Sequence, residues 1–351
     1  MDFIKNKGID IKFGVKLPFS PLEKIYETAN LAEKLHFDSI WSPDHLTSLN
    51  PNDLSTYSVW CILSTVARET RNCIIGTSVT DCLRLNVAVL AQISTTIQEI
   101  SGGRFILGIG IGEAQNTVPY GIPCDKKTAR LTETITGLRL LWSQEEVNFS
   151  GNFVKLKSAS VMPLPSQRIP IWIGANSINT IKITFSMGDG WLPLAIKFSP
   201  AEYSSILETF GKTSRKQNSF TPALFVHTLA EKNADDAWKK VKEMGKMLLI
   251  LWKPEIFKQY GIEISDDFYA HKFTFSKQNK QRLLNLLKTL PDDPLYENFV
   301  VGGSDDCIEK IEKYVKAGVD HFILSLMVDS KNLPDSINYY KKAVVDYFKG
   351  G

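Results

Sequence analysis

Short apolar segments alternate with amphipathic segments along nearly the whole chain, and this alternation restricts the possible folds more than any other feature. The apolar segments have the length of buried strands and lie at 11–17, 39–42, 73–80, 105–109, 171–174, 190–192, 221–230 and 321–326. Helical periodicity fills 21–35, 56–69, 87–100, 126–142, a segment from residue 179, 235–251, 305–317 and 336–348. Strands separated by helices imply parallel βαβ units. About eight such pairs predict an α/β fold, a (β/α)8 TIM barrel with insertions, and a doubly wound open sheet is the alternative.

The length of 351 residues fits either one domain or two. At about 150 residues per domain it suggests two, but a single barrel commonly runs to roughly 250 residues and more with insertions. Since the composition does not change along the chain, we expect one domain over 1–351, with insertions near 143–168 and 252–298. Residues 147–156 alternate around Ser150 and Gly151, which predicts a hairpin, whereas 252–291 are irregular or helical. Ser20 is the expected N-cap of the first helix.

Charge and composition exclude several classes of protein. The chain has 41 basic and 38 acidic residues, a net charge of +3, which does not indicate nucleic acid or an anionic membrane as a partner. No apolar run reaches the ~18 residues of a membrane span, and the first fifteen residues do not resemble a secretory signal. The odd cysteine count, five, without a CxxC pair supports neither a disulfide framework nor a zinc site. We therefore expect a cytoplasmic protein with a small-molecule substrate and no metal.

Polar and glycine residues follow the predicted strands, where functional groups of a barrel gather. The segment GIGIGEAQN follows the fourth strand, and GANSIN follows the fifth. The candidate positions in strand order are Lys16, Asp44, His45, Ser78, Val79, Thr80, Asp81, Gly108, Gly110, Gly112, Glu113, Asn116, Gly174, Ala175, Asn176, Ser177 and Lys197. These residues would surround one mouth of the barrel.

Each candidate also has a purely structural interpretation. The GIGIGE segment is a weak match to a dinucleotide fingerprint, because no long helix begins directly after it, and its glycines could instead let the backbone approach a flat or phosphorylated ligand. His45 suits proton transfer because histidine titrates near neutrality, but a lone histidine is often structural. Glu113 could be an exposed loop carboxylate and Lys197 a solvated charge. Asn176 and Ser177 could cap the next helix or leave its N-terminus open for a phosphate.

Taken together, these segments resemble a known family. FGVKLP, FDSIWSPDHL, ISGGRFILGIGIGEAQN followed by RLTE and LW, IPIWIGANS, and the tail VVGGSDDCIEKIEKYVKAGVDHFIL are similar to the luciferase-like flavin and deazaflavin oxidoreductases. The similarity runs from about residue 11 to 326 and is strongest to the branch that uses coenzyme F420. It implies a barrel enzyme, usually a homodimer, that transfers hydride between F420 and a small substrate, with FMN as the alternative cofactor.

The resemblance also implies roles for individual residues. His45 would exchange the proton of the substrate, acting as base on a hydroxyl, and Glu113 would assist with the second proton. Ser78 and Val79 match a non-prolyl cis peptide behind the deazaflavin ring. The other cofactor-binding positions are Asp44, Thr80, Gly112 and Asn116 near the ring, and Gly174, Ala175, Asn176, Ser177 and Ile178 at the phosphate tail.

Several positions depart from the family pattern and bear on the substrate. Leu49 stands where the dehydrogenase branch usually has tryptophan, and Lys16 stands where the methylenetetrahydromethanopterin reductases have an acidic residue. Lys197 matches a phosphate-binding position, but Asn298 replaces the arginine expected beside it. Lys16, Leu49 and Lys197 are therefore the expected substrate-binding residues, for an alcohol or a sugar phosphate. The alternatives are a methylenetetrahydromethanopterin reductase, an FMN-dependent monooxygenase, and a non-catalytic flavin-binding barrel.

Overall fold

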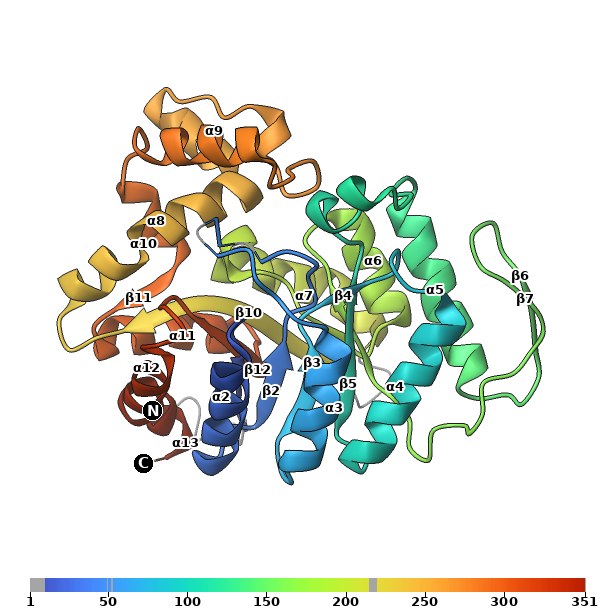
Figure 1. Ribbon diagram of the computed structural model, residues 1–351. Coiled ribbons are helices and arrows are strands. Elements are labelled where there is room, and N and C mark those ends of the chain that lie inside the picture. Colours follow the sequence, from blue (N-terminus) through green and yellow to red (C-terminus); the bar gives the residue numbers. More distant parts are fainter. Residues whose placement is uncertain (1–9, 49, 52, 215–219, 351) are drawn as a thin grey trace.

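Eight parallel strands close into a barrel in the computed structural model, which describes residues 10–48, 50–51, 53–214 and 220–350 (Figure 1). The barrel strands are β1 (Lys12–Lys16), β2 (Ser39–Ser42), β3 (Ile74–Thr77) continued by β4 (Thr80–Asp81), β5 (Phe105–Gly110), β8 (Ile171–Gly174), β9 (Gly190–Trp191), β10 (Thr221–Ala230) and β12 (His321–Leu326). β9 pairs with β10 through Gly190 and Thr221, which closes the ring. The predicted (β/α)8 barrel is confirmed, and the open-sheet alternative is wrong because this pairing leaves no free edge.

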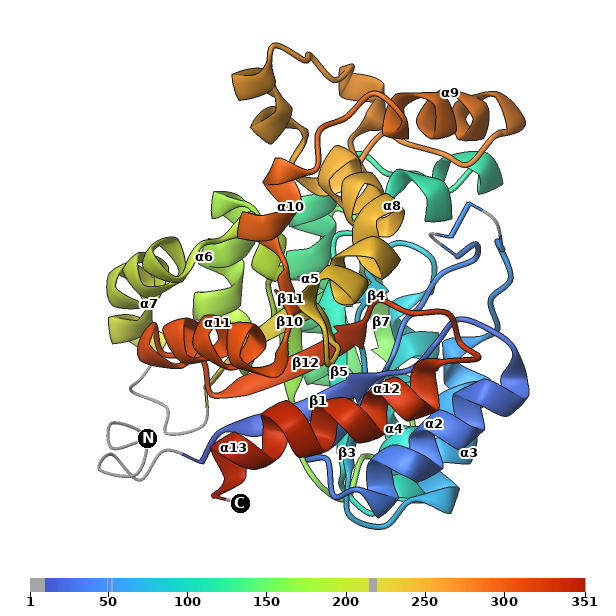
Figure 2. The same cartoon turned by 90° about the vertical axis from the view of Figure 1, so that its left-hand side faces the viewer.

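Helices surround the barrel, as Figures 1 and 2 show. They are α2 (Leu22–Lys34), α3 (Val59–Glu69), α4 (Val87–Ser101), α5 (Lys127–Leu141), α6 (Ile178–Met187), α7 (Pro200–Ser214), α8 (Ala234–Trp252), α11 (Ser304–Lys316), α12 (Leu333–Tyr340) and α13 (Asp346–Lys349). Apart from α8, their apolar faces pack on the outside of the strands and form one hydrophobic core with them. None of the helices in the described part of the chain is long and apolar enough to cross a membrane.

Large side chains fill the N-terminal half of the barrel interior. The rings of Trp41 and Trp172 stack with centroids 5.1 Å apart, and His321 packs edge-on against Trp172 at 5.2 Å. Gly76 makes room for this filling, because a Cβ there would lie 2.4 Å from the Trp41 ring. These rings separate a cavity at the N-terminal end of the barrel, which Lys12, Trp172 and His321 line, from the cavity at the C-terminal ends of the strands, where barrel enzymes bind their ligands.

Residues 252–298, the second predicted insertion, form a second hydrophobic cluster with α8, above the barrel in Figure 1. It contains the short helices η4 (Pro254–Tyr260), η5 (Asp266–Phe268), α9 (Lys277–Leu287) and α10 (Asp293–Asn298). A short strand that the sequence analysis did not predict, β11 (Val300–Gly302), follows α10 and pairs with the end of β10. This cluster covers one side of the barrel mouth.

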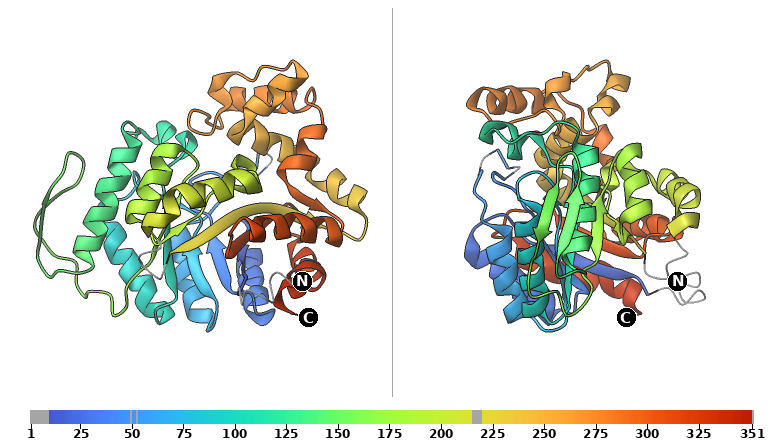
Figure 3. Two further views of the ribbon diagram at one scale, coloured as in Figure 1. Left: turned by 180° about the vertical axis from the view of Figure 1, so that it is seen from behind. Right: turned by 90° about the vertical axis from the view of Figure 1, so that its right-hand side faces the viewer.

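Two local predictions have opposite outcomes. The hairpin is confirmed as antiparallel β6 (Val147–Ser150) and β7 (Lys155–Ala159), which stand apart from the barrel (Figure 3). The predicted N-cap at Ser20 is wrong, because α2 begins at Leu22 with Pro21 as its N-cap. The Ser20 hydroxyl donates to the Asp53 carboxylate at 2.8 Å instead of to the helix.

Candidate active site

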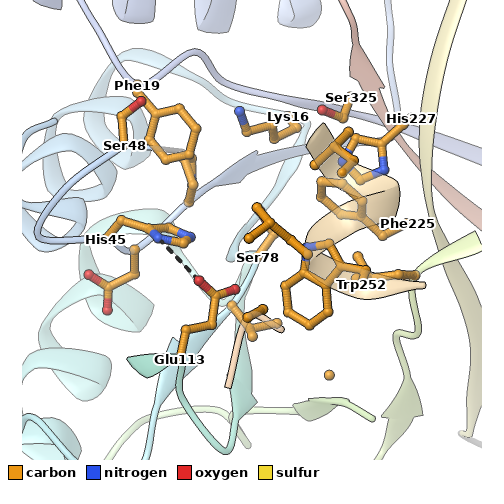
Figure 4. Close-up of a pocket in the computed structure, with 18 of the residues that line it drawn as sticks. Lys16, Phe19, His45, Ser48, Ser78, Glu113, Phe225, His227, Trp252 and Ser325 are labelled. Carbon is orange, nitrogen blue, oxygen red and sulfur yellow. Dashed lines mark ion pairs between the residues drawn. The ribbon is translucent and has the colours of Figure 1, made fainter. Parts of the chain in front are cut away.

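A cavity of about 670 Å³ opens at the C-terminal ends of the barrel strands (Figure 4). It brings together most of the residues predicted from strand ends, which are Lys16, Asp44, His45, Ser78, Val79, Thr80, Asp81, Gly110, Gly112, Glu113, Asn116, Gly174, Asn176, Ser177 and Lys197. Gly108, Ala175 and Ile178 do not line it, and Leu49 lies outside the described residues. The barrel predicted from the sequence therefore brings the correct strand ends together at one cavity.

His45 follows β2 and presents its ring to the cavity, edge-on to Phe19 at 5.4 Å. Two side-chain amides meet its Nδ1: Nε2 of Gln115 at 3.1 Å and Nδ2 of Asn116 at 3.1 Å. The orientation of Asn116 is fixed, because its Oδ1 accepts the backbone N–H of Leu46 at 2.9 Å, so its NH2 group must face His45. Nδ1 is therefore a hydrogen-bond acceptor, and the ring proton sits on Nε2.

His45 is neutral at physiological pH. Burial lowers its pKa to about 3, with further lowering by the positive charges of Arg84 and Lys16. Among the described residues, Nε2 of the ring has no hydrogen-bond partner, and Figure 4 shows it on the cavity side. A neutral Nε2–H can donate a hydrogen bond to a ligand oxygen in the cavity.

Glu113 lies beside His45 at the start of η1 (Ala114–Asn116), the short 3-10 helix that also carries Gln115. Its Oε2 accepts a hydrogen bond from Gln115 at 3.0 Å and lies 3.9 Å from Nδ1 of His45. Burial raises the pKa of the Glu113 carboxyl to about 7. A carboxyl with this pKa can give or take a proton near neutrality, which a solvated glutamate does poorly.

Asp44 is held by neighbouring side chains at the edge of the cavity. Its carboxylate accepts the Thr80 hydroxyl at 2.6 Å and pairs with the Arg84 guanidinium at 2.6 Å. Arg84 also pairs with Asp81, so one cation compensates two buried carboxylates. Arg84 was not among the residues predicted from the sequence. Its only signal was an arginine three residues after the paired Asp81, at the spacing of a local ion pair.

Val79 forms part of the cavity floor. The Ser78–Val79 peptide bond is cis, which confirms the geometry implied by the resemblance. A Cβ on Gly110 or Gly174 would lie 3.0 or 3.1 Å from Cγ2 of Val79, so these glycines leave room for its side chain. The Ser78 hydroxyl is buried and has no partner among the described residues. Such an unsatisfied buried group is suited to a polar ligand.

The segment between β8 and α6 supports the cavity with its side chains as well as its backbone. Oδ1 of Asn176 accepts the backbone N–H of Leu194 at 2.9 Å, and the Ala175 carbonyl accepts the Trp191 indole N–H at 2.9 Å. Gly174, Asn176 and Ser177 face the cavity, and α6 begins directly after them. Ser177 is the N-cap residue of α6, and its backbone N–H donates to Oγ1 of Thr180 at 3.2 Å, so Ser177 caps the helix and the Asn176 amide has a structural role.

Lys197 lines the cavity, but its ammonium already contacts other groups of the protein. Nζ donates to the Trp252 carbonyl at 2.6 Å and lies 3.4 Å from Oε1 of Glu255. Asn298, at the position where the family pattern has arginine, accepts instead from Lys253 at 3.0 Å. The expected phosphate-binding role of Lys197 is therefore not supported by its contacts.

The rest of the wall comes from residues that the sequence analysis did not single out. Leu192, Leu194, Phe225, Met244, Met247, Leu248, Leu251, Trp252 and Ala270 make much of it apolar, and His227 and Ser325 add polar groups. His227 and Ser325 lie near the C-terminal ends of two predicted strands, and this position could have identified them as cavity residues from the sequence. Within the described part of the chain, His, Cys, Asp and Glu form no cluster able to hold a metal.

Known proteins are similar to this chain over most of its length. The phthiodiolone/phenolphthiodiolone dimycocerosates ketoreductase of Mycobacterium bovis is 27% identical over 318 residues, which cover 82% of this chain and 83% of the relative. The F420-dependent glucose-6-phosphate dehydrogenase of Microbacterium testaceum is 27% identical over 328 residues, covering 90% and 91%. An F420-dependent secondary alcohol dehydrogenase, solved with an F420-acetone adduct, shares the fold with a TM-score of 0.80 at 20% identity, covering 96% of this chain and 99% of that chain.

The family itself follows from the match to a family model. The model of the luciferase-like monooxygenases matches residues 11–321, from β1 to the start of β12. This range includes every segment that supplies His45, Glu113 and the cavity floor. The chain belongs to the luciferase-like monooxygenase family.

Proposed function

We propose that this protein is a coenzyme F420-dependent oxidoreductase that interconverts a carbonyl group and an alcohol on a small substrate. The observation that carries the proposal is the position of the Glu113 carboxyl, whose Oε2 lies 3.9 Å from Nδ1 of His45 at one cavity and whose pKa burial raises to about 7. Reduction of a carbonyl needs one hydride and one proton, and these two residues provide for the proton. The relatives include a ketoreductase and an F420-dependent dehydrogenase, which supports this reaction class.

The residues present fit a flat ring with an anionic tail. The unpaired Ser78 hydroxyl would be a polar partner for the ring, Val79 would offer it an apolar surface, and Gly174, Asn176 and Ser177, which line the cavity before α6, would lie beside the tail. When bound, F420 would supply C5 of its deazaflavin as the hydride donor or acceptor. Asp44 would hold this edge of the site in place through Thr80 and Arg84.

His45 and Glu113 divide the proton chemistry. The Nε2–H of His45 donates a hydrogen bond to the substrate oxygen and stabilises the negative charge that develops there during reduction. Glu113 supplies the proton, and in the reverse direction its carboxylate accepts it. This division differs from the one implied by the family resemblance, in which His45 was the base. The fixed amide of Asn116 places an N–H against Nδ1, and so it favours the donor role.

The contacts favour a ketone or alcohol over a sugar phosphate, because the Lys197 ammonium is bound to Trp252 and Glu255. Lys16 stands where the pterin reductases have an acid, which speaks against methylenetetrahydromethanopterin. An FMN-dependent monooxygenase is the remaining alternative within the family.

Binding of F420 and of FMN to the purified apo-protein tests the proposal. We expect F420 to bind with quenched fluorescence, FMN to bind weakly, and reduced F420 to be oxidised by a ketone without oxygen consumption. His45→Phe is expected to abolish ketone-dependent oxidation while leaving F420 bound. Preferential binding of FMN, together with oxygen uptake, would refute the proposal.

A further inference from the structure

Lys16, Ser325 and His227 lie in one row across three adjacent strands at the barrel mouth. Val15 pairs with Leu324 between β1 and β12, which places Lys16 beside Ser325. His227 pairs with Ser325 between β10 and β12. All three residues line the cavity, and Figure 4 shows Ser325 and His227 on the side away from His45 and Glu113, with the Lys16 ammonium between them and Phe19.

The Lys16 ammonium has no anionic partner in the described part of the chain. Nζ lies 4.1 Å from the centre of the Phe19 ring, and no carboxylate is within 4.0 Å of it. The acids that line the same cavity are Asp44, Asp53, Asp81, Glu113 and Asp329, all beyond that distance. Burial lowers the pKa of Lys16 to about 8, so it is still largely protonated at neutral pH. An enclosed cation without a counter-ion is costly unless a ligand compensates it.

His227 supplies the second observation. Its Nδ1 is buried and has no hydrogen-bond partner among the described residues. Burial lowers the pKa of this histidine to about 3, and the positive charge of Lys16 lowers it further, so the ring is neutral. The ring packs against Phe225 at 5.2 Å and Phe299 at 6.2 Å, which holds it in place. The row therefore combines one cation, one hydroxyl and one neutral imidazole.

We propose that Lys16, Ser325 and His227 form a subsite for a carboxylate of the substrate, so that the substrate is an oxo acid or the corresponding hydroxy acid. The subsite carries a single positive charge, which matches a monoanion. A phosphate dianion would need a second cation, and Lys197 is held by Trp252 and Glu255. The body of the substrate would lie against the apolar side chains that α8 contributes, Met244, Leu248 and Leu251. This inference rests on the proposed function for the reacting carbonyl, but the carboxylate subsite does not depend on the cofactor.

Binding to the apo-protein tests the subsite without any reaction. Butanoate and hexanoate, each with the amide of the same shape, are titrated into the full-length protein by calorimetry. We expect the carboxylates to bind more tightly than the amides, and Lys16→Met to weaken carboxylate binding by roughly 30-fold. Ser325→Ala should weaken it by about five-fold, as for one lost hydrogen bond. Equal binding of acid and amide, or tighter binding of inorganic phosphate, would overturn the proposal.

Lys12→Met is the matched control, since Lys12 lies on the same strand at the opposite end of the barrel. It removes the same charge and should leave carboxylate binding unchanged, and equal weakening by both variants would overturn the subsite. With reduced F420, Lys16→Met should lower kcat/KM for oxo acids at least ten-fold more than for neutral methyl ketones. A loss of F420 affinity in Lys16→Met would instead assign Lys16 to the cofactor and refute the inference. Carboxylate binding that depends on Lys16 in a protein that does not bind F420 would support the subsite and refute the proposed function.

Discussion

Replacement of Asn116 by aspartate tests the position of the His45 ring proton. In the native protein, Oδ1 of Asn116 accepts the Leu46 backbone N–H at 2.9 Å, and Nδ2 donates to Nδ1 of His45 at 3.1 Å. Aspartate has the same shape, so it can keep the contact with Leu46. It replaces the donor facing His45 by an acceptor, however, which favours a ring proton on Nδ1, and the Gln115 amide that also meets Nδ1 then turns its unpaired Oε1 toward the ring. Nε2 loses its proton and can no longer donate to the substrate.

The expected loss in rate follows from these contacts. A carboxylate about 4 Å from an imidazolium, at an effective dielectric constant of about 20, stabilises it by roughly 4 kcal/mol, or about 3 pKa units. Since the pKa of His45 starts at about 3, the ring remains mostly neutral at pH 7, and the main change is the position of its proton. Removal of one donor from a developing oxyanion lowers kcat by about 100-fold to 1,000-fold. We expect Asn116→Asp to lower kcat for ketone reduction by about 100-fold.

Two measurements check this prediction. Nitrogen-15 NMR of labelled histidine should show the proton of His45 on Nε2 in the native protein and on Nδ1 in Asn116→Asp. Steady-state oxidation of reduced F420 by a ketone gives kcat, and the same substitution in a His45→Ala background serves as control, since there it should have little further effect. An Nδ1-protonated His45 in the native protein, or an unchanged kcat in Asn116→Asp, would refute the assignment.

Three further predictions concern other parts of the site. With a neutral ketone, kcat/KM for reduction should fall as the pH rises through about 7, because Glu113 loses the proton that it supplies. Glu113→Gln should remove this pH dependence, and a pH dependence that persists in the variant would exclude Glu113 as the proton donor. Gly110→Ala places a Cβ 3.0 Å from Cγ2 of Val79 and should weaken F420 binding about ten-fold, as measured by fluorescence titration. An unchanged affinity would contradict the assignment of Val79 to the floor of the cofactor site. Arg84→Met leaves the buried carboxylates of Asp44 and Asp81 without a counter-ion and should lower the free energy of unfolding, measured in urea, by about 3–5 kcal/mol. A loss below about 1 kcal/mol would show that Arg84 does not compensate these two charges.

The fold could be predicted from the sequence because each strand and helix carries its own periodicity. What the sequence did not reveal depends on short or competing local signals. β11 has only three residues, Val300–Gly302, too few for a pattern, and it forms by pairing with β10. The Ser20 hydroxyl had the chemistry of an N-cap, but the carboxylate of Asp53, distant in sequence, competes for it. Tertiary contacts override capping preferences in such cases.

The site could be predicted only in part, for a similar reason. The strand-end rule located Lys16, His45 and Glu113, because position along a strand is a local property. The tautomer of His45 depends on Asn116, a residue 71 positions away, and on its contact with the backbone of Leu46. The row of polar residues beside Lys16 depends on the register of β10, β12 and β1, which no local pattern specifies. Residue types can thus be assigned to the cavity from sequence, but their hydrogen-bond partners cannot.

Electrostatics connects the two sides of the cavity. Burial is the larger cause of the low pKa of His45, and the charges of Arg84 and Lys16 add to it. If a carboxylate binds Lys16, it cancels one of these charges, and the pKa of His45 rises. Because burial and Arg84 still act, we expect the ring to remain neutral with the substrate in place. Substrate recognition at Lys16 is therefore compatible with a neutral Nε2–H donor at His45. For a neutral ketone, which does not use Lys16, the titration of the reaction near pH 7 should belong to Glu113.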